Sequence, residues 1–330
     1  MTSQLTDQFN RTINYIRISV TDRCDFRCIY CMAEKMEFLP KTQLLSLEEI
    51  DRIASIFISL GVEKIRITGG EPLVRKNIDS LFSSLSKNKG LKELTLTTNA
   101  SQLKKKALML KSSGVKRINI SLDSLDPLTF KKMTRTGVLE DVLKGIEHAV
   151  EVGFEKIKLN TVLMKGINDH ELFELIDYAI KHGLDISFIE EMPLGSTDFE
   201  RKVTAVSNND VLEKIKDKYS VKSISLSTGG PAKYWQIEGS NTRVGLISPH
   251  SHNFCEDCNR VRISCKGELF LCLGQEEKIE LMPLLRNHLH DDQPIKDAII
   301  NSMKIKPLSH EFNLNQSKPA IVRFMSHTGG

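Results

Sequence analysis

Residues 14–31, with the sequence NYIRISVTDRCDFRCIYC, join a strand pattern to three closely spaced cysteines. In the first part, Asn14–Val20, polar and apolar side chains alternate, as they do on a strand with one buried face. Cys24, Cys28 and Cys31 follow with the spacing C-x3-C-x2-C, so one loop can turn three thiolates toward one metal centre. Iron–sulfur clusters are held by cysteine thiolates, and three ligands on a four-iron cluster leave one iron open to another molecule. A zinc site short of one ligand, or free thiols, are the alternatives.

The strand pattern recurs along the chain as far as residue 192, and a helical pattern follows each of the first five strands. The predicted strands are Asn14–Val20, Glu63–Thr68, Leu91–Thr98, Lys116–Asp123, Glu155–Leu163 and Leu184–Met192. The predicted helices lie near residues 46–60, 76–88, 101–113, 138–152 and 169–182, and the first begins with the capping-box pattern Ser46-Leu-Glu-Glu49. Alternation of this kind forms a parallel sheet with right-handed crossovers. Six units are fewer than the eight of a closed barrel, so an open six-stranded barrel and a doubly wound sheet both fit.

Five of the predicted strands keep one polar face. Its residues are Tyr15, Arg17, Ser19, Lys64, Arg66, Thr68, Thr95, Thr97, Asn99, Asn119, Ser121, Asp123, Lys156, Lys158 and Asn160. Parallel strands that are covered on both faces normally have continuous apolar sequences. Solvated edge strands explain one or two such strands but not five, so we expect a barrel with a polar lumen that holds a ligand. Because cations stand among these positions, that ligand is expected to be an anion.

After Met192 the pattern changes, and a second, smaller region is predicted. It has a helix near 208–218, strands at Asn241–Ser248, Arg260–Ser264 and Glu268–Leu273, and helices near 279–289 and 292–303. We therefore expect an α/β chain in two parts. Residues 1–192 form an incomplete, open (β/α)6 barrel of the TIM type, and an α+β region at 193–330 closes it.

The chain has seven cysteines, and six of them fall into two groups of three. The second group, Cys255, Cys258 and Cys272, has the spacing C-x2-C-x13-C. Cys265 is left over, and it shares a predicted strand face with apolar neighbours, so we expect a small buried side chain rather than a metal ligand. His250 and His252 lie near the second group and are expected to be hydrogen-bonded loop residues.

Composition excludes several classes of protein. Lys and Arg number 46 and Asp and Glu 42, a net charge of +4 that is too small for a nucleic-acid coat. The first residues have no signal-peptide pattern, and no apolar run is long enough to cross a membrane, so a cytoplasmic location is expected. The nucleotide-binding motif G-x4-G-K-[ST] is missing, which excludes a P-loop GTPase.

The first cysteine group and its surroundings resemble the radical S-adenosylmethionine (SAM) superfamily. That family has the same C-x3-C-x2-C spacing with an aromatic residue before the last cysteine, here Tyr30. A second motif of the family is Gly69-Gly70-Glu71-Pro72, at the end of the second predicted strand. The resemblance implies a [4Fe–4S] cluster on the first three cysteines. Its open iron binds SAM, which is cleaved to methionine and a 5′-deoxyadenosyl radical.

With its second cysteine group, the whole chain is similar to the GTP 3′,8-cyclases of molybdenum cofactor biosynthesis, the MoaA family. The matching features are Ser248–Cys255, the segment Asn259-Arg-Val-Arg262 and the terminal Gly329-Gly330. The resemblance implies a second [4Fe–4S] cluster on Cys255, Cys258 and Cys272, whose open iron faces the purine of GTP. The implied reaction moves a hydrogen atom from the ribose C3′ to the radical. Attack on C8 of guanine then gives (8S)-3′,8-cyclo-7,8-dihydroguanosine 5′-triphosphate.

The resemblance also implies roles for single residues. SAM contacts are expected at Tyr30, Gly70, Ser121 and Met192. GTP contacts are expected at Arg17, Arg66, Thr97, Lys158, Arg260 and Arg262. Catalytic roles are expected for Arg17, Arg260, Arg262, Gly329 and Gly330, because the tail is thought to reach the active site and help position its arginines.

The implied partners are GTP, a reductant of the flavodoxin or ferredoxin type, and cyclic pyranopterin monophosphate synthase, which is linked through the product. No nucleic-acid or membrane partner is expected, and the sequence leaves monomer and homodimer open. Two other functions compete. One is a two-cluster radical SAM enzyme that modifies a peptide or RNA, which the terminal glycines and the C-x2-C-N-R-x-R segment disfavour. The other is a non-catalytic iron–sulfur or zinc protein that binds nucleic acid, which the low net charge disfavours.

Overall fold

In the computed structural model, the described residues are 4–195, 201–226, 229–251, 254–312 and 321–329. The six strands predicted for the first region are present, with bounds within three residues of the predicted ones. They are β1 (Tyr15–Ser19), β2 (Lys64–Thr68), β3 (Glu93–Thr98), β4 (Val115–Ser121), β5 (Lys156–Val162) and β6 (Asp185–Ile189). They pair in parallel and in chain order. A doubly wound sheet reverses its strand order, so this sheet is the open six-stranded barrel.

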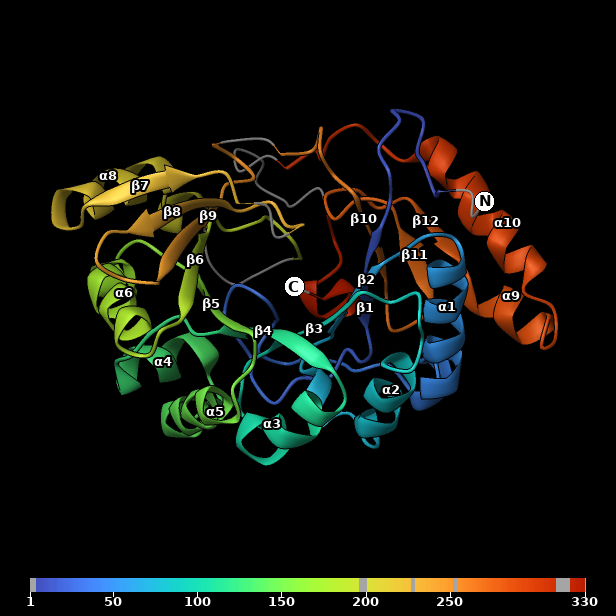
Figure 1. Ribbon diagram of the computed structural model, residues 1–330, viewed down its shortest axis with the longest axis horizontal. Helices are drawn as coiled ribbons and strands as arrows, with labels where there is room; N and C mark the ends of the chain where they lie inside the picture. The colour runs from blue at the N-terminus through green and yellow to red at the C-terminus, as the bar shows by residue number, and fades with distance from the viewer. Residues whose placement is uncertain (1–3, 196–200, 227–228, 252–253, 313–320, 330) are drawn as a thin grey trace.

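Helices cover the outer face of these strands (Figure 1). They are α1 (Leu47–Ser59), α2 (Ile78–Leu85), α3 (Leu103–Ser112), α4 (Pro127–Thr134), α5 (Leu139–Val152) and α6 (Leu172–Lys181), with short 3-10 turns at Lys41–Gln43, Pro72–Val74 and Asp169–Glu171. The capping box of α1 is confirmed, because Ser46 and Glu49 each accept a hydrogen bond from the other's backbone N–H. Helix α4 was not predicted, since its pattern is short.

The outward faces of the strands carry the apolar residues that the helices bury. Ile16, Ile18, Ile65 and Ile67 are fully buried. Burial of one such side chain contributes about 1.5–3 kcal/mol. The alternation therefore separates an apolar outer layer from a polar inner face.

The C-terminal region extends the same sheet at both edges. Its strands are β7 (Val221–Ile224), β8 (Lys233–Ile237), β9 (Arg243–Ile247), β10 (Arg260–Ile263), β11 (Glu268–Phe270) and β12 (Lys278–Glu280). The full order is β12-β11-β10-β1-β2-β3-β4-β5-β6-β9-β8-β7. β10 is parallel to β1 and β9 is parallel to β6, whereas the outermost strands at each edge pair antiparallel. Among the described residues the sheet does not close, since β12 and β7 are its two edges.

The remaining helices are α7 (Arg201–Thr204), α8 (Asn208–Lys218), α9 (Met282–Asn287), α10 (Gln293–Ser302), a 3-10 turn at Met303–Ile305 and α11 (Met325–Thr328). The sequence placed a helix over residues 279–289, but Lys278–Glu280 is strand β12 because it pairs with β11. The end of the chain lies on the inner side of the sheet (Figure 1). In the described residues, no helix is long and apolar enough to cross a membrane.

Candidate active site

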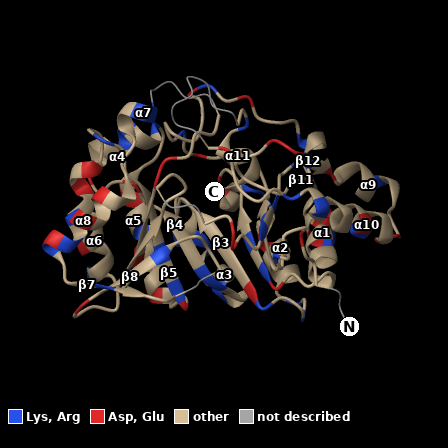
Figure 2. Ribbon diagram, turned by 90° about the horizontal axis from the view of Figure 1, so that it is seen from above, with Lys and Arg blue, Asp and Glu red and all other residues tan. Residues whose placement is uncertain are grey.

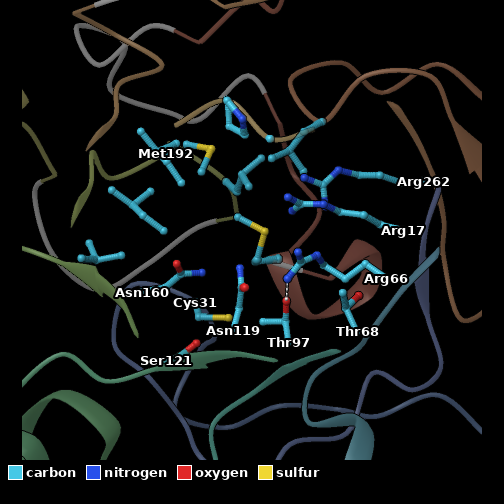
Figure 3. Close-up of a pocket in the computed structure, with 18 of the residues that line it drawn as sticks. Arg17, Cys31, Arg66, Thr68, Thr97, Asn119, Ser121, Asn160, Met192 and Arg262 are labelled. Atoms are coloured by element: carbon cyan, nitrogen blue, oxygen red, sulfur yellow. Dashed lines mark hydrogen bonds between the residues drawn. The ribbon is translucent and has the colours of Figure 1, made fainter. Parts of the chain in front are cut away.

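The inner face of the sheet lines a deep pocket (Figure 3). The predicted site residues that line it are Arg17, Cys24, Cys28, Tyr30, Cys31, Arg66, Gly70, Thr97, Ser121, Lys158, Met192, Cys255, Cys258, Arg260, Arg262 and Cys272. Four residues of the predicted polar face do not line this space: Ser19, Lys64, Thr95 and Lys156. Lys64 pairs instead with Glu93 at 2.6 Å, and Lys156 is exposed. The two cysteine groups, which are more than 200 positions apart in sequence, therefore open into one pocket.

The first cysteine loop follows β1 and is held from several sides. Within the loop, Cys31 N–H donates to the carbonyl of Cys28 at 3.0 Å. Arg27 N–H donates to the carbonyl of Thr134 at 2.9 Å, so the end of α4 supports the loop. The amide of Asn99 lies 3.8 Å from the Cys24 sulfur.

Burial raises the pKa of the Cys31 thiol to about 12 and raises that of Cys28 well above its usual value, and repulsion among the cysteines adds to the effect at Cys28. A bound metal reverses such shifts because thiolates ligate it directly. Among the described residues, no three His, Cys, Asp or Glu side chains converge on the position of one metal ion. A [4Fe–4S] cluster makes a different demand, since each thiolate binds its own iron. The three closely spaced, half-buried cysteines therefore fit that cluster.

The Gly69-Gly70 pair packs against the start of the cysteine loop. A side chain at Gly70 would put its Cβ 2.4 Å from the carbonyl oxygen of Arg23, so only glycine fits. The next residue, Glu71, accepts hydrogen bonds from Thr98 Oγ1 at 2.8 Å and from Asn99 N–H at 2.7 Å. The motif therefore ties the end of β2 to the cysteine loop and to the end of β3.

Tyr30 and Asp123 join the cysteine loop to the far wall of the pocket. The Tyr30 hydroxyl donates to Asp123 Oδ2 at 2.7 Å, and Asp123 Oδ1 accepts from Val162 N–H at 2.9 Å. Burial raises the pKa of Asp123 to about 6. Asn160 points into the same space near Ser121 (Figure 3), and its buried Oδ1 has no hydrogen-bond partner among the described residues. Sequence reasoning placed Asn160 on the polar face but missed it as a site residue.

A buried lysine that the sequence did not indicate supports the second cysteine group. Lys306 is 1% exposed, and its ammonium donates to the carbonyl of Leu271 at 2.6 Å and lies 3.8 Å from the sulfur of Cys258. Burial would raise the pKa of Cys258, but Arg260 and Lys306 outweigh it and lower that pKa to about 7. These contacts favour the thiolate form that an iron ligand needs.

Arg11 anchors the same region from the N-terminus. Its guanidinium donates to the carbonyls of Cys255 at 2.7 Å and Pro307 at 2.6 Å, and it pairs with Asp7 at 2.6 Å. The alternating pattern begins only at Asn14, so no signal in the sequence marked this residue.

Strand register brings three arginines into one row. Arg17 pairs with Arg262 on one side and with Arg66 on the other. The three side chains project into the same part of the pocket (Figure 3), and Arg66 also donates to Thr97 Oγ1 at 3.2 Å. Burial lowers the pKa of Arg17 and lowers that of Arg262 well below its usual value. Three neighbouring cations repel one another and cost free energy unless an anion offsets their charge. The row of guanidinium groups therefore offers a binding surface for the predicted anionic ligand.

The C-terminal tail reaches this row. Arg262 donates a hydrogen bond to the carbonyl of Gly329, and a Cβ at Gly329 would overlap Thr68 Oγ1 at 1.6 Å. The φ of Gly329 is +74°, in the region that favours glycine. Arg323 fixes the tail further, because it donates to the carbonyl of Leu273 at 2.5 Å. Gly330 lies outside the described residues.

Cys265 was expected to be buried and His250 to be a hydrogen-bonded loop residue, and both are. Cys265 is fully buried, and its carbonyl accepts from Leu45 N–H at 2.8 Å. His250 hydrogen-bonds through Nε2 to the carbonyl of Glu191 at 2.8 Å. His252 lies outside the described residues.

Comparison with known proteins agrees with this architecture. Residues 18–179 match the model of the Radical SAM superfamily, and residues 184–312 match that of Molybdenum Cofactor Synthesis C. The S. suis protein SuiB, whose structure was solved with S-adenosylmethionine bound, has a similar fold with a TM-score of 0.63. It is 18% identical, and the alignment covers 96% of this chain and 78% of SuiB. The chain is therefore a radical SAM enzyme, a class that uses SAM and a [4Fe–4S] cluster.

Closer relatives define the family. The GTP 3′,8-cyclase of Ectopseudomonas mendocina is 51% identical over 330 residues, 100% of this chain and 99% of that protein. The enzyme from Saccharophagus degradans with the same name is 50% identical over 329 residues, 99% of each chain. This chain belongs to the family of GTP 3′,8-cyclases.

Proposed function

We propose that the chain binds GTP at the row of arginines and converts it to (8S)-3′,8-cyclo-7,8-dihydroguanosine 5′-triphosphate, the first step of molybdenum cofactor biosynthesis. One observation carries the proposal: Arg262, Arg17 and Arg66 stand side by side in a pocket that both cysteine groups also line. Family membership supports the reaction, and the row of guanidinium groups supports a triphosphate as the anion.

The first cysteine group would hold the SAM cluster. Its ligands would be Cys24, Cys28 and Cys31, and SAM would contact Tyr30, Gly70, Ser121 and Met192. A bound, reduced cluster would supply the electron that cleaves the C5′–S bond of SAM, giving methionine and the 5′-deoxyadenosyl radical that takes hydrogen from the ribose. The chain's own part is placement: Tyr30 is fixed by Asp123, and the backbone at Gly70 packs directly against the start of the cysteine loop.

The second cysteine group, Cys255, Cys258 and Cys272, would hold another [4Fe–4S] cluster with one iron open toward GTP. The fit rests on three thiols in one wall of the pocket and on two cations, Arg260 and Lys306, that favour a thiolate at Cys258. A cluster with bound thiolates carries negative charge, and the same cations would offset it.

Binding of GTP would use Arg17, Arg66, Thr97, Lys158, Arg260 and Arg262. Lys158 stands across the pocket from the arginine row, and its ammonium lies 3.3 Å from the hydroxyl of Tyr234. Cations on both sides of the pocket would hold the triphosphate and leave the ribose near the first cysteine group. Orientation of the reacting atoms is the largest contribution that such a site can make to a radical reaction.

The tail would close this arrangement. The carbonyl of Gly329 accepts a hydrogen bond from Arg262, so the tail would orient an arginine of the substrate site. We assign Arg17, Arg260, Arg262, Gly329 and Gly330 to the catalytic machinery on this basis. We also propose residues 1–192 and 193–330 as the two functional parts, a flavodoxin- or ferredoxin-type reductant as electron donor, and cyclic pyranopterin monophosphate synthase as consumer of the product.

One experiment tests the proposal. Both clusters are reconstituted without oxygen and reduced, SAM and GTP are added, and 5′-deoxyadenosine and the cyclised nucleotide are measured by chromatography and mass spectrometry. We expect both products in equal amounts and only with GTP present. Cleavage of SAM at the same rate without GTP would defeat the assignment, and ATP in place of GTP serves as the matched control.

A further inference from the structure

Tyr15 lies at the centre of the cationic wall of the pocket, and the family resemblance gave it no role. It is 1% exposed and occupies β1 between β2 and β10. Its phenolic oxygen accepts from Arg66 Nε at 2.6 Å and from Arg17 Nε at 3.3 Å. One oxygen atom therefore joins two arginines of the proposed GTP site, which otherwise repel each other.

Positive charges surround this oxygen from every neighbouring strand. The groups that act on it are Arg17 on β1, Lys64 and Arg66 on β2, and Arg260 and Arg262 on β10. Glu93 on β3 is the acidic side chain next to them, and it is already paired with Lys64 at 2.6 Å and Arg117 at 3.0 Å. Tyr15 is therefore the group placed to balance the arginine row while no nucleotide is bound.

The electrostatics agree with that placement. Burial alone would raise the pKa of Tyr15, but the four cations Arg17, Arg66, Lys64 and Arg260 outweigh it and lower that pKa to about 6. The oxygen is then largely ionised near neutral pH in the free protein. A triphosphate on the same arginines adds negative charge beside it, which favours the protonated phenol.

We propose that Tyr15 is a positioning residue for GTP: its oxygen holds Arg17 and Arg66 aligned in the free enzyme and takes up one proton from solvent when the triphosphate binds. This inference rests on the proposed function, because it needs a triphosphate at the arginine row. It differs from a purely structural role, since packing of the ring alone couples no proton to binding.

The coupling has a definite sign. Below pH 6 the phenol is already protonated in the free enzyme, so GTP binding requires no proton. As pH rises from 6 to 8, the affinity of the wild type for GTP falls by up to about tenfold per pH unit, because binding must take up a proton. A variant without the hydroxyl lacks this dependence but also lacks the alignment of the arginines.

The test compares wild type with Tyr15→Phe, both as holoenzyme with two clusters and without SAM, so that GTP binds but does not react. Calorimetry in two buffers of different ionisation enthalpy gives the protons taken up with GTP. We expect wild type to take up as much as about one proton more than the variant at pH 7.5. At pH 6 the variant should bind GTP about tenfold more weakly, and the gap should narrow toward pH 8.

Tyr178→Phe is the matched control, because the buried hydroxyl of Tyr178 has no hydrogen-bond partner among the described residues and its residue does not line the pocket. It should behave as wild type in both measurements. Equal proton uptake in wild type and Tyr15→Phe, or parallel pH curves, would overturn the inference while leaving GTP binding intact. If wild type itself fails to bind GTP, the proposed function falls instead. In turnover, Tyr15→Phe should raise KM for GTP more than it lowers kcat, and the reverse would contradict a positioning role.

Discussion

Each of the two cysteine groups presents three thiols, but the charged residues around the two groups differ. At the first group, burial and the nearby carboxylates of Glu71 and Asp123 raise the thiol pKa values. At the second group, burial likewise raises the pKa values of Cys255 and Cys272, but Arg260 and Lys306 outweigh burial at Cys258 and lower its pKa to about 7. Figure 2 shows Lys and Arg mixed with Asp and Glu on outer helices such as α6 and α8, so the difference between the two cysteine groups is local to them.

The difference matches the molecules that each group would face. SAM carries a sulfonium cation, which an acidic surrounding favours, whereas GTP carries a triphosphate, which a basic surrounding favours. The two groups also differ in spacing, C-x3-C-x2-C against C-x2-C-x13-C, and the charges around the thiols agree with the same assignment. Four experiments test this difference between the two cysteine groups.

Removal of one ligand from each group should have the largest effect. Cys24→Ala and Cys258→Ala should each abolish cyclisation and lower iron from about eight to about four per chain, since each group holds its own cluster. Only Cys258→Ala should still cleave SAM to 5′-deoxyadenosine. Cys265→Ala is the matched control, because that cysteine is buried away from the pocket, and its iron content should be unchanged. Loss of all iron in either single variant would mean that the groups are not independent.

Deletion of Gly329 and Gly330 should abolish cyclisation while both clusters remain. The milder Gly329→Ala places a Cβ on Thr68 at φ +74° and ψ 145°, a backbone region essentially confined to glycine, at a strain of about 1–3 kcal/mol before the overlap is counted. Product formation and the ultraviolet–visible spectrum of the clusters measure the two effects. A combined Gly329→Ala, Thr68→Gly variant removes both overlapping atoms, the Oγ1 and the Cβ of Thr68, and should recover part of the activity. A fully active truncation would refute the role of the tail.

Arg17→Ala should weaken GTP binding about 10- to 100-fold, because a guanidinium at the centre of the arginine row loses its charged hydrogen bonds. Binding of SAM, measured separately, should change little, since Arg17 belongs to the basic half of the pocket. Arg17→Lys keeps the charge but not the fork, so it should fall between wild type and alanine. Equal weakening of SAM binding and GTP binding would contradict the proposed difference between the two halves of the pocket.

Lys306→Met should have the smallest effect and should act on the second cluster alone. Methionine keeps the length of the side chain but removes the charge near Cys258, so that cluster should become harder to reduce and lose iron to a chelator about 10-fold faster. Redox titration followed by electron paramagnetic resonance separates the two clusters. Lys304→Met, two residues away on an exposed site, is the control. A shift in the reduction potential of the first cluster would contradict the expectation that Lys306 acts on the second cluster alone.

Much of the barrel followed from local pattern. Alternation in segments such as Lys64–Thr68 assigned strands and predicted that Arg66 faces the lumen, because a strand turns successive side chains to opposite faces. The capping box at Ser46 and the glycine pair at Gly69-Gly70 were readable for the same reason, since each acts within a few residues. Alternation was less reliable at strand ends, where Lys156 proved exposed.

The sequence by itself determined the six βα units, the two cysteine groups, the polar inner face and the family. It also indicated that Cys265 is buried, because that residue shares a face with apolar neighbours. Only the tertiary structure decided that C-terminal strands flank the barrel at both edges, which sets Arg262 beside Arg17. It alone placed Lys306 against Cys258 and Tyr15 between two arginines. The reason is physical: alternation within a strand shows which of its faces is buried, but it does not specify which distant strand becomes its neighbour.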